Sequence, residues 1–147
     1  MNEHRLPALL MHLLEKGRWH TGNAAQALWT VTGFDPRASL LFLDIPGMSR
    51  ETAAARSIAV LDQAPHYGLM HRRGADLNPG FLDAAQLVVI AVDRDENIIC
   101  LDYSRDPEMP SVKCSQYPAG CGSVQWNEIS LTFESFASLI GLNKDMG

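Results

Sequence analysis

The clearest hydrophobic pattern lies near the C-terminus, where apolar residues recur at helical spacing between residues 133 and 140. One face of such a helix would carry Phe133, Phe136, Ala137 and Ile140. Thr132 is placed to cap its start and Gly141 to end it. Leu131 and Phe136 have the spacing of a hydrophobic staple. The pattern predicts an amphipathic C-terminal helix.

Leucines near the N-terminus repeat at i, i+3, i+4, i+7 and i+8, which is also one face of a helix. They are Leu6, Leu9, Leu10, Leu13 and Leu14. Gly17 suits the C-terminal end of this helix. Two further helices are expected, over residues 22–31 and over residues 50–64, the latter with Ser49 as its N-cap.

A different pattern, continuous and β-branched, occupies residues 87–92 (LVVIAV) and predicts a strand buried on both faces. Residues 98–103 (IICLDY) read as a second strand, and the polar connector 93–97 (DRDEN) has the length of a hairpin loop. Residues 111–117 predict a third strand, and the apolar run 39–46 favours another. We therefore expect an α+β fold, a single domain over residues 1–147 with a mainly antiparallel or mixed sheet flanked by helices.

Composition narrows the range of functions. The chain has 147 residues, 46% of them hydrophobic, and a net charge of −5. The acidic balance and the single compact basic pair, Arg72-Arg73, argue against nucleic-acid binding. No segment approaches the ~20 apolar residues of a membrane span. The three cysteines and the amphipathic start predict a cytoplasmic protein in a reducing compartment.

Acidic residues cluster around the 93–97 connector and raise the question of metal binding. Asp93, Asp95 and Asn97 match the first three positions of a calcium loop. The match then fails, because Ile98 replaces the glycine of the turn and Ser104 replaces the bidentate glutamate. No metal and no cofactor are expected.

Asp93 and Asp102 could form a pair of catalytic carboxylates if the hairpin brought them together. The simpler interpretation is that Asp93 and Asp95 bond the backbone of their own turn, while Asp102 faces solvent or pairs with an arginine. None of the five histidines lies in a zinc-protease motif, and no nucleophile elbow or phosphate loop occurs. The sequence predicts a protein that is not an enzyme.

With these elements placed, residues 76–142 resemble the SUKH superfamily, which includes the Smi/Knr-like proteins. Its members have a similar strand, a polar turn, an ICLDY segment, then a tryptophan and an SFEEFL-like helix. The matching residues here are Ile99, Cys100, Leu101, Asp102, Tyr103, Trp126, Ile129, Phe133, Glu134, Phe136 and Leu139.

The resemblance implies a non-catalytic immunity protein that binds and neutralises a polymorphic bacterial toxin of the nuclease or deaminase type. Acidic side chains would steer a basic protein partner. The expected partner-binding residues are Asp93, Asp95, Glu96, Asp102, Tyr103 and Asp106. A regulatory or scaffold module without a toxin is the alternative, and a small hydrolase using Asp93 and Asp102 is a weaker one. An exposed strand edge would support a homodimer.

Overall fold

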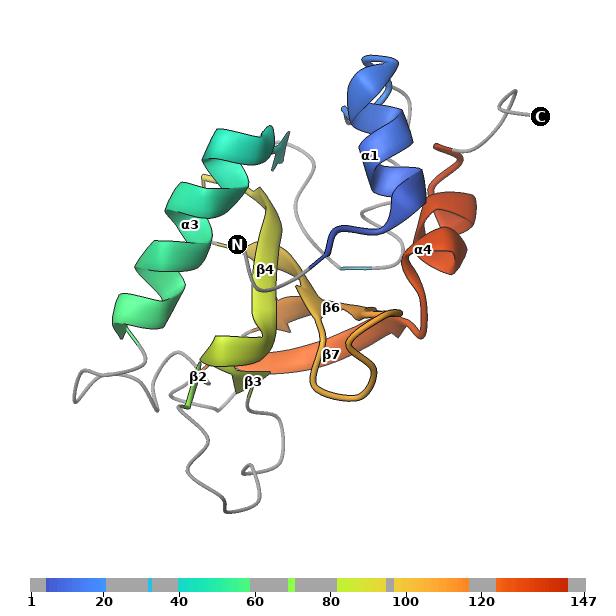
Figure 1. Ribbon diagram of the computed structural model, residues 1–147. Coiled ribbons are helices and arrows are strands. Elements are labelled where there is room, and N and C mark those ends of the chain that lie inside the picture. Colours follow the sequence, from blue (N-terminus) through green and yellow to red (C-terminus); the bar gives the residue numbers. More distant parts are fainter. Residues whose placement is uncertain are drawn as a thin grey trace.

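The computed structural model describes residues 5–20, 32, 40–58, 69–70, 82–94, 97–116 and 124–142. The described helices are α1 (Ala8–Glu15), α3 (Ile45–Ile58) and α4 (Phe133–Leu139), with a short 3-10 turn η4 (Ala84–Gln86). The predicted helix over residues 22–31 lies outside the described residues. The arrangement in Figure 1 confirms the α+β fold class.

Five strands form an antiparallel sheet in the order β1-β4-β5-β6-β7. They are β1 (Leu41–Phe42), β4 (Leu87–Val92), β5 (Ile98–Asp102), β6 (Ser111–Gln116) and β7 (Gln125–Ser130). A separate parallel pair consists of β2 (Leu69–Met70) and β3 (Leu82–Asp83). Strand β4 is buried along residues 87–91, as its unbroken apolar sequence predicts.

Helices α1 and α4 lie side by side and cover one side of the sheet (Figure 1). Their packing is centred on aromatic rings. Trp19 stacks on Phe42 of β1 with 4.1 Å between ring centroids, and its centroid lies 5.7 Å from that of Phe133. The indole Nε1 of Trp19 donates a hydrogen bond of 3.0 Å to the carbonyl of Leu43. Burial of these three rings contributes strongly to the stability of the fold. Because the indole N–H is hydrogen-bonded, it is not buried without a partner.

The ends of α4 agree with the sequence prediction. The Thr132 hydroxyl accepts a hydrogen bond from the Ser135 N–H at 3.1 Å. Gly141 has a positive φ of 77°, and the next N–H, of Leu142, donates to the Ala137 carbonyl at 2.9 Å. This is the Schellman ending that glycine permits. Leu131, expected to form a staple, is instead 61% exposed.

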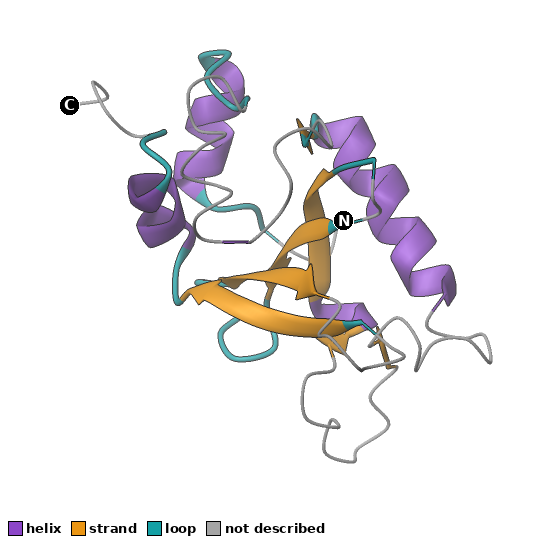
Figure 2. Cartoon of the chain, turned by 180° about the vertical axis from the view of Figure 1, so that it is seen from behind, coloured by secondary structure: helices purple, strands orange, loops and turns teal. Residues whose placement is uncertain are grey.

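Helix α3 begins earlier than predicted, so the assignment of Ser49 as its N-cap is wrong. The cap is Asp44, whose Oδ1 accepts a hydrogen bond from the Gly47 N–H at 2.8 Å. Pro46 is tolerated there because N–H groups in the first turn have no partner within the helix. The helix runs along β4 (Figure 2), and the Thr52 hydroxyl accepts the Val89 N–H at 2.9 Å. It therefore covers part of an otherwise exposed strand edge.

Among the described helices, none is both long enough and apolar enough to cross a bilayer.

Candidate functional site

The β4–β5 turn holds the first of the predicted partner-binding acids. The two carboxylate oxygens of Asp93 accept hydrogen bonds from the backbone N–H and the side-chain amide of Asn97, at 2.8 and 3.0 Å. The backbone of the same two residues is bonded at 3.1 Å. This confirms that Asp93 stabilises its own turn. Asp95 and Glu96 lie outside the described residues.

Asp102 is buried, with 3% of its surface exposed. Its Oδ2 lies 2.6 Å from Lys113 Nζ, and its Oδ1 accepts the Ser104 N–H at 3.0 Å. The register pairs Cys100 with Lys113, so Lys113 and Asp102 project from the same face of neighbouring strands. The expectation of a solvent-facing or arginine-paired Asp102 is wrong.

Tyr103 follows directly on this strand and is 2% exposed. Its hydroxyl donates a 2.7 Å hydrogen bond to the carbonyl of Arg5. Burial raises the pKa of Tyr103 above its ordinary value. Tyr103, which the sequence predicts as a partner-binding residue, is therefore buried and ties the segment before α1 to the end of β5.

Asp93 and Asp102 do not converge. The antiparallel register places Val92, next to Asp93, opposite Ile98, whereas Asp102 lies opposite Leu87. Ile98 and Asp102 stand four residues apart along β5, which at strand rise is about 13 Å. The carboxylate pair that the hydrolase alternative requires is therefore not formed by these two residues.

The thiol in the core of the hairpin, that of Cys100, has the properties of an unreactive cysteine. Cys100 is fully buried in β5, and burial is the main cause that raises the pKa of its thiol well above the usual value. It behaves as the small buried hydrophobe that the apolar sequence around it predicts. Within the described residues, no three His, Cys, Asp or Glu side chains are grouped to hold a metal.

Asp106 lies in the loop between β5 and β6 and shapes it. Its Oδ1 accepts the N–H groups of Glu108 and Met109, at 2.8 and 3.3 Å. Such a turn fixes the direction in which the following side chains leave the loop. Beside it, Arg105 and Glu128 form an ion pair of 3.1 Å that is largely exposed and worth little energetically.

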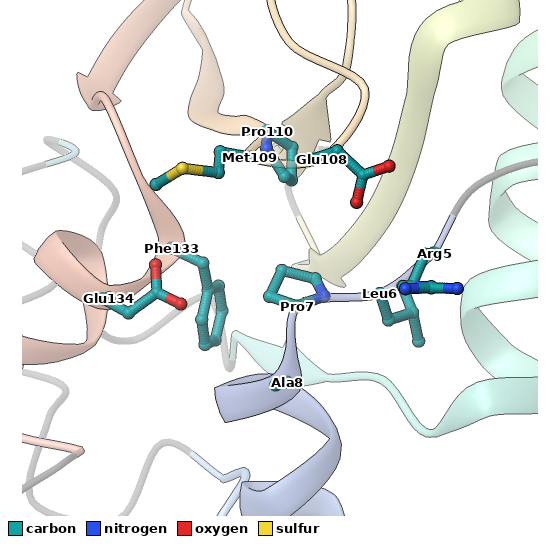
Figure 3. Close-up of a pocket in the computed structure, with 9 residues that line it drawn as sticks. All are labelled: Arg5, Leu6, Pro7, Ala8, Glu108, Met109, Pro110, Phe133 and Glu134. Carbon is teal, nitrogen blue, oxygen red and sulfur yellow. The ribbon is translucent and has the colours of Figure 1, made fainter.

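This loop borders a surface cavity of about 250 Å³. The cavity is lined by residues 5–8 before and at the start of α1, by loop residues 108–110, and by residues 133–134 of α4 (Figure 3). Three distant segments thus meet at one place. No local sequence pattern marks this meeting, because it depends on how α1 and α4 pack.

The cavity has apolar walls and an acidic rim. Phe133 and Pro110 are buried, whereas Glu108 and Glu134 are exposed. Figure 3 shows the two carboxyl groups on opposite sides of Pro7. In the part of the chain that the structure describes, neither carboxylate takes part in an ion pair or a side-chain hydrogen bond.

Exposed apolar side chains adjoin this rim. Met109, Leu131 and Leu139 are 54%, 61% and 51% exposed. A second, more open depression lies along α4 between Glu134 and Leu139, and it shares Glu134 with the cavity. We call these five residues, Glu108, Met109, Leu131, Glu134 and Leu139, the docking surface.

Comparison of the chain with protein-family models, with curated proteins and with solved structures finds no match. The resemblance of residues 76–142 to the SUKH superfamily therefore stays a prediction.

Proposed function

We propose that the protein is a non-catalytic, cytoplasmic immunity protein, which binds and neutralises a bacterial toxin of the nuclease or deaminase type. The proposal combines the SUKH resemblance with the docking surface. The observation that carries it is the presence, at one site, of exposed apolar side chains around two carboxylates that the described part of the chain leaves unpaired.

The apolar component is typical of a protein interface. Large apolar side chains exposed together mark interaction sites more often than isolated ones do. Met109, Leu131 and Leu139 are each more than half exposed. Met109 lines the cavity, Leu139 lines the depression beside it, and Leu131 lies two positions before the start of α4. A partner that covered them would gain roughly 25 cal/mol for each Å² of apolar surface removed from water.

The charge component suits the proposed class of toxin. Enzymes that act on nucleic acid carry basic surfaces, because their substrate is a polyanion. This chain has a net charge of −5, and Glu108 and Glu134 place part of that charge at the docking surface. Opposite charges speed the encounter of two proteins and favour the correct partner.

The separation of Asp93 and Asp102 supports a binding role over the hydrolase alternative. One carboxylate is bonded within its own turn and the other is paired with Lys113 inside the fold. General acid–base catalysis needs groups within hydrogen-bond reach of a common substrate. The two groups are instead committed to the structure at opposite ends of β5.

The test is co-expression with a toxin domain encoded beside the gene. We expect that the protein restores growth and co-purifies with the toxin, and that Leu131→Asp abolishes both effects. Leu41→Asp is the matched control, because Leu41 is 60% exposed but lies in β1, outside the docking surface. A toxin that stays active and unbound would overturn the proposal. A neighbourhood without any toxin-like gene would favour the regulatory or scaffold alternative.

A further inference from the structure

We propose that the cavity between α1, the 104–110 loop and α4 receives an arginine side chain of the partner protein. This deepens the proposed function, and it rests on that function only in assigning the arginine to a toxin. The inference comes from the size, the walls and the charge of the cavity.

The size of the cavity limits what it can bind. At about 250 Å³ it falls below the ~300–1,000 Å³ typical of pockets for drug-sized ligands and cofactors. It holds the liquid volume of about eight water molecules, at ~30 Å³ each. A single long side chain fits this space better than a whole metabolite does.

The walls suit the aliphatic stem and flat head of an arginine. Phe133, Pro7 and Pro110 present rings to the cavity from three segments (Figure 3). Only the Phe133 ring is aromatic, and it is 1% exposed, so the walls offer mainly apolar contact. The weak hydration of a guanidinium group lowers its cost of leaving water for such a site. The methylene stem would lie against the same apolar surface.

The charges of the rim select a cation. Glu108 and Glu134 contribute two carboxylates, and Arg5 contributes one positive group, so the lining carries a net charge of −1. An anionic ligand would meet both carboxylates, and a purely apolar group would strip them of water without replacing it. The planar fork of arginine can bond carboxylates on two sides, which the compact ammonium of lysine does less well.

The cavity is held in shape by hydrogen bonds in each of its three segments. The Tyr103 hydroxyl binds the Arg5 carbonyl, Asp106 binds the N–H groups of residues 108 and 109, and Thr132 caps α4. A site that is fixed before binding loses less conformational entropy when its ligand arrives. The acid that shapes the loop, Asp106, is therefore a different residue from the two acids of the cavity rim, Glu108 and Glu134.

The experiment uses the whole protein and a fragment probe, so it needs no toxin. N-acetylarginine methylamide is titrated into ¹⁵N-labelled protein, with N-acetylcitrulline methylamide as its neutral isostere. We expect saturable shifts confined to the amides around Ala8, Met109 and Glu134, with a Kd on the order of 1–10 mM. The citrulline probe should bind at least about tenfold more weakly, since it lacks the charge.

Variants that each remove one charge test both the direction and the size of the effect on binding of the arginine probe. Glu108→Gln and Glu134→Gln should each weaken binding of the arginine probe about two- to fivefold, and Arg5→Gln should strengthen it about twofold. Glu51→Gln in α3 is the matched control and should leave the Kd unchanged. Because Glu134 lies in the first turn of α4, thermal unfolding of its variant is measured alongside, while Glu108 lies outside the helices.

Equal shifts with both probes, shifts away from the cavity, or no change in either glutamate variant would overturn the inference. The arginine site and the proposed function can fail independently of each other. If the arginine probe fails but the toxin is neutralised, only the arginine site is wrong. If the probe binds as expected but no toxin is bound, the cavity stands and the immunity role falls.

Discussion

Two pairs of acids lie at different places in this fold, and they differ in what their carboxylates contact. Asp93 and Asp102 belong to the β4–β5 hairpin and are bonded to Asn97 and to Lys113. Glu108 and Glu134 border the cavity, and the described part of the chain offers their carboxylates no partner. The first pair stabilises the fold, whereas the second faces outward.

The density of acids along a sequence is therefore a poor guide to a binding surface. Asp93 lies at the hairpin turn because a turn favours polar side chains that bond its backbone, whereas Asp102 lies in β5 and pairs with Lys113. The cavity acids are 26 positions apart, one in the loop between β5 and β6 and the other in α4, and they border one cavity only in the folded chain. Mutations should separate the two pairs, since the hairpin pair is expected to affect folding and the cavity pair to affect binding.

The largest expected effect is that of Asp102→Ala. It leaves the Lys113 ammonium, 22% exposed in its side chain, without its partner in a largely buried site. We expect the free energy of unfolding to fall by about 3 kcal/mol, measured by urea denaturation. The double variant Asp102→Ala/Lys113→Met should recover part of the loss. A loss under about 0.5 kcal/mol would mean that the pair contributes no more than a surface ion pair.

Asp93→Ala should cost less, about 1.5 kcal/mol, because it removes two hydrogen bonds from a partly buried turn. Asp93→Asn keeps an oxygen acceptor and serves as the control, with a loss of about half as much. If both variants are as stable as the parent protein in urea, the turn does not depend on this side chain.

Alkaline pH should weaken the fold through Tyr103. Burial holds its pKa above that of an unfolded tyrosine, near 10. The stabilisation is therefore complete below pH 10 and is lost as the pH rises towards the higher folded pKa. We expect a loss of about 1 kcal/mol by pH 11, after allowance for solvent screening. The free energy of unfolding of Tyr103→Phe, measured by urea denaturation, should not show this loss. A parallel decline with pH in both proteins would assign the effect to other groups.

The smallest effects on folding should come from the cavity acids. Glu108→Gln and Glu134→Gln are changes at exposed positions and should shift the free energy of unfolding by at most about 0.5 kcal/mol. Thermal denaturation of both variants checks this. A larger loss would indicate that the carboxylates stabilise the fold, contrary to the distinction between the two pairs.

Local signals predicted much of the fold. Thr132 and Gly141 delimit α4, and the unbroken apolar run of residues 87–92 marks β4, because capping and two-sided burial both leave a pattern in adjacent residues. The start of α3 differs from the sequence prediction because Asp44 and Pro46 also fit the end of the strand predicted over residues 39–46. An Asp two positions before a proline is equally consistent with a helix start.

Strand β7 was not predicted because its burial does not alternate regularly. Val124 and Trp126 are buried, but Asn127 and Glu128 are both exposed. The register shifts between β6 and β7, so that one residue of β7 has no partner. Such a bulge interrupts the alternation of buried and exposed residues by which a strand is recognised in a sequence.

The candidate site was the least predictable part. Of the five acids and one tyrosine expected to bind a partner, Asp102 and Tyr103 are buried, and Asp93 and Asp106 bond their own loops. The roles of Asp95 and Glu96 stay predictions. Only Glu134 of the cavity rim appeared in the sequence argument, as part of the C-terminal helix. Exposure and the meeting of distant segments are properties of the packed chain, which spacing along one segment does not record.

The most direct test of the distinction between the two acid sets is calorimetric titration with the toxin domain encoded beside the gene. Two double variants with equal charge loss are compared under conditions where both are folded, Glu108→Gln/Glu134→Gln at the cavity and Asp93→Asn/Asp102→Asn at the hairpin. We predict that the cavity variant binds at least about tenfold more weakly, a loss of about 1.4 kcal/mol, while the hairpin variant stays within about twofold of the parent protein. The opposite order, with affinity lost at the hairpin and kept at the cavity, would contradict the account.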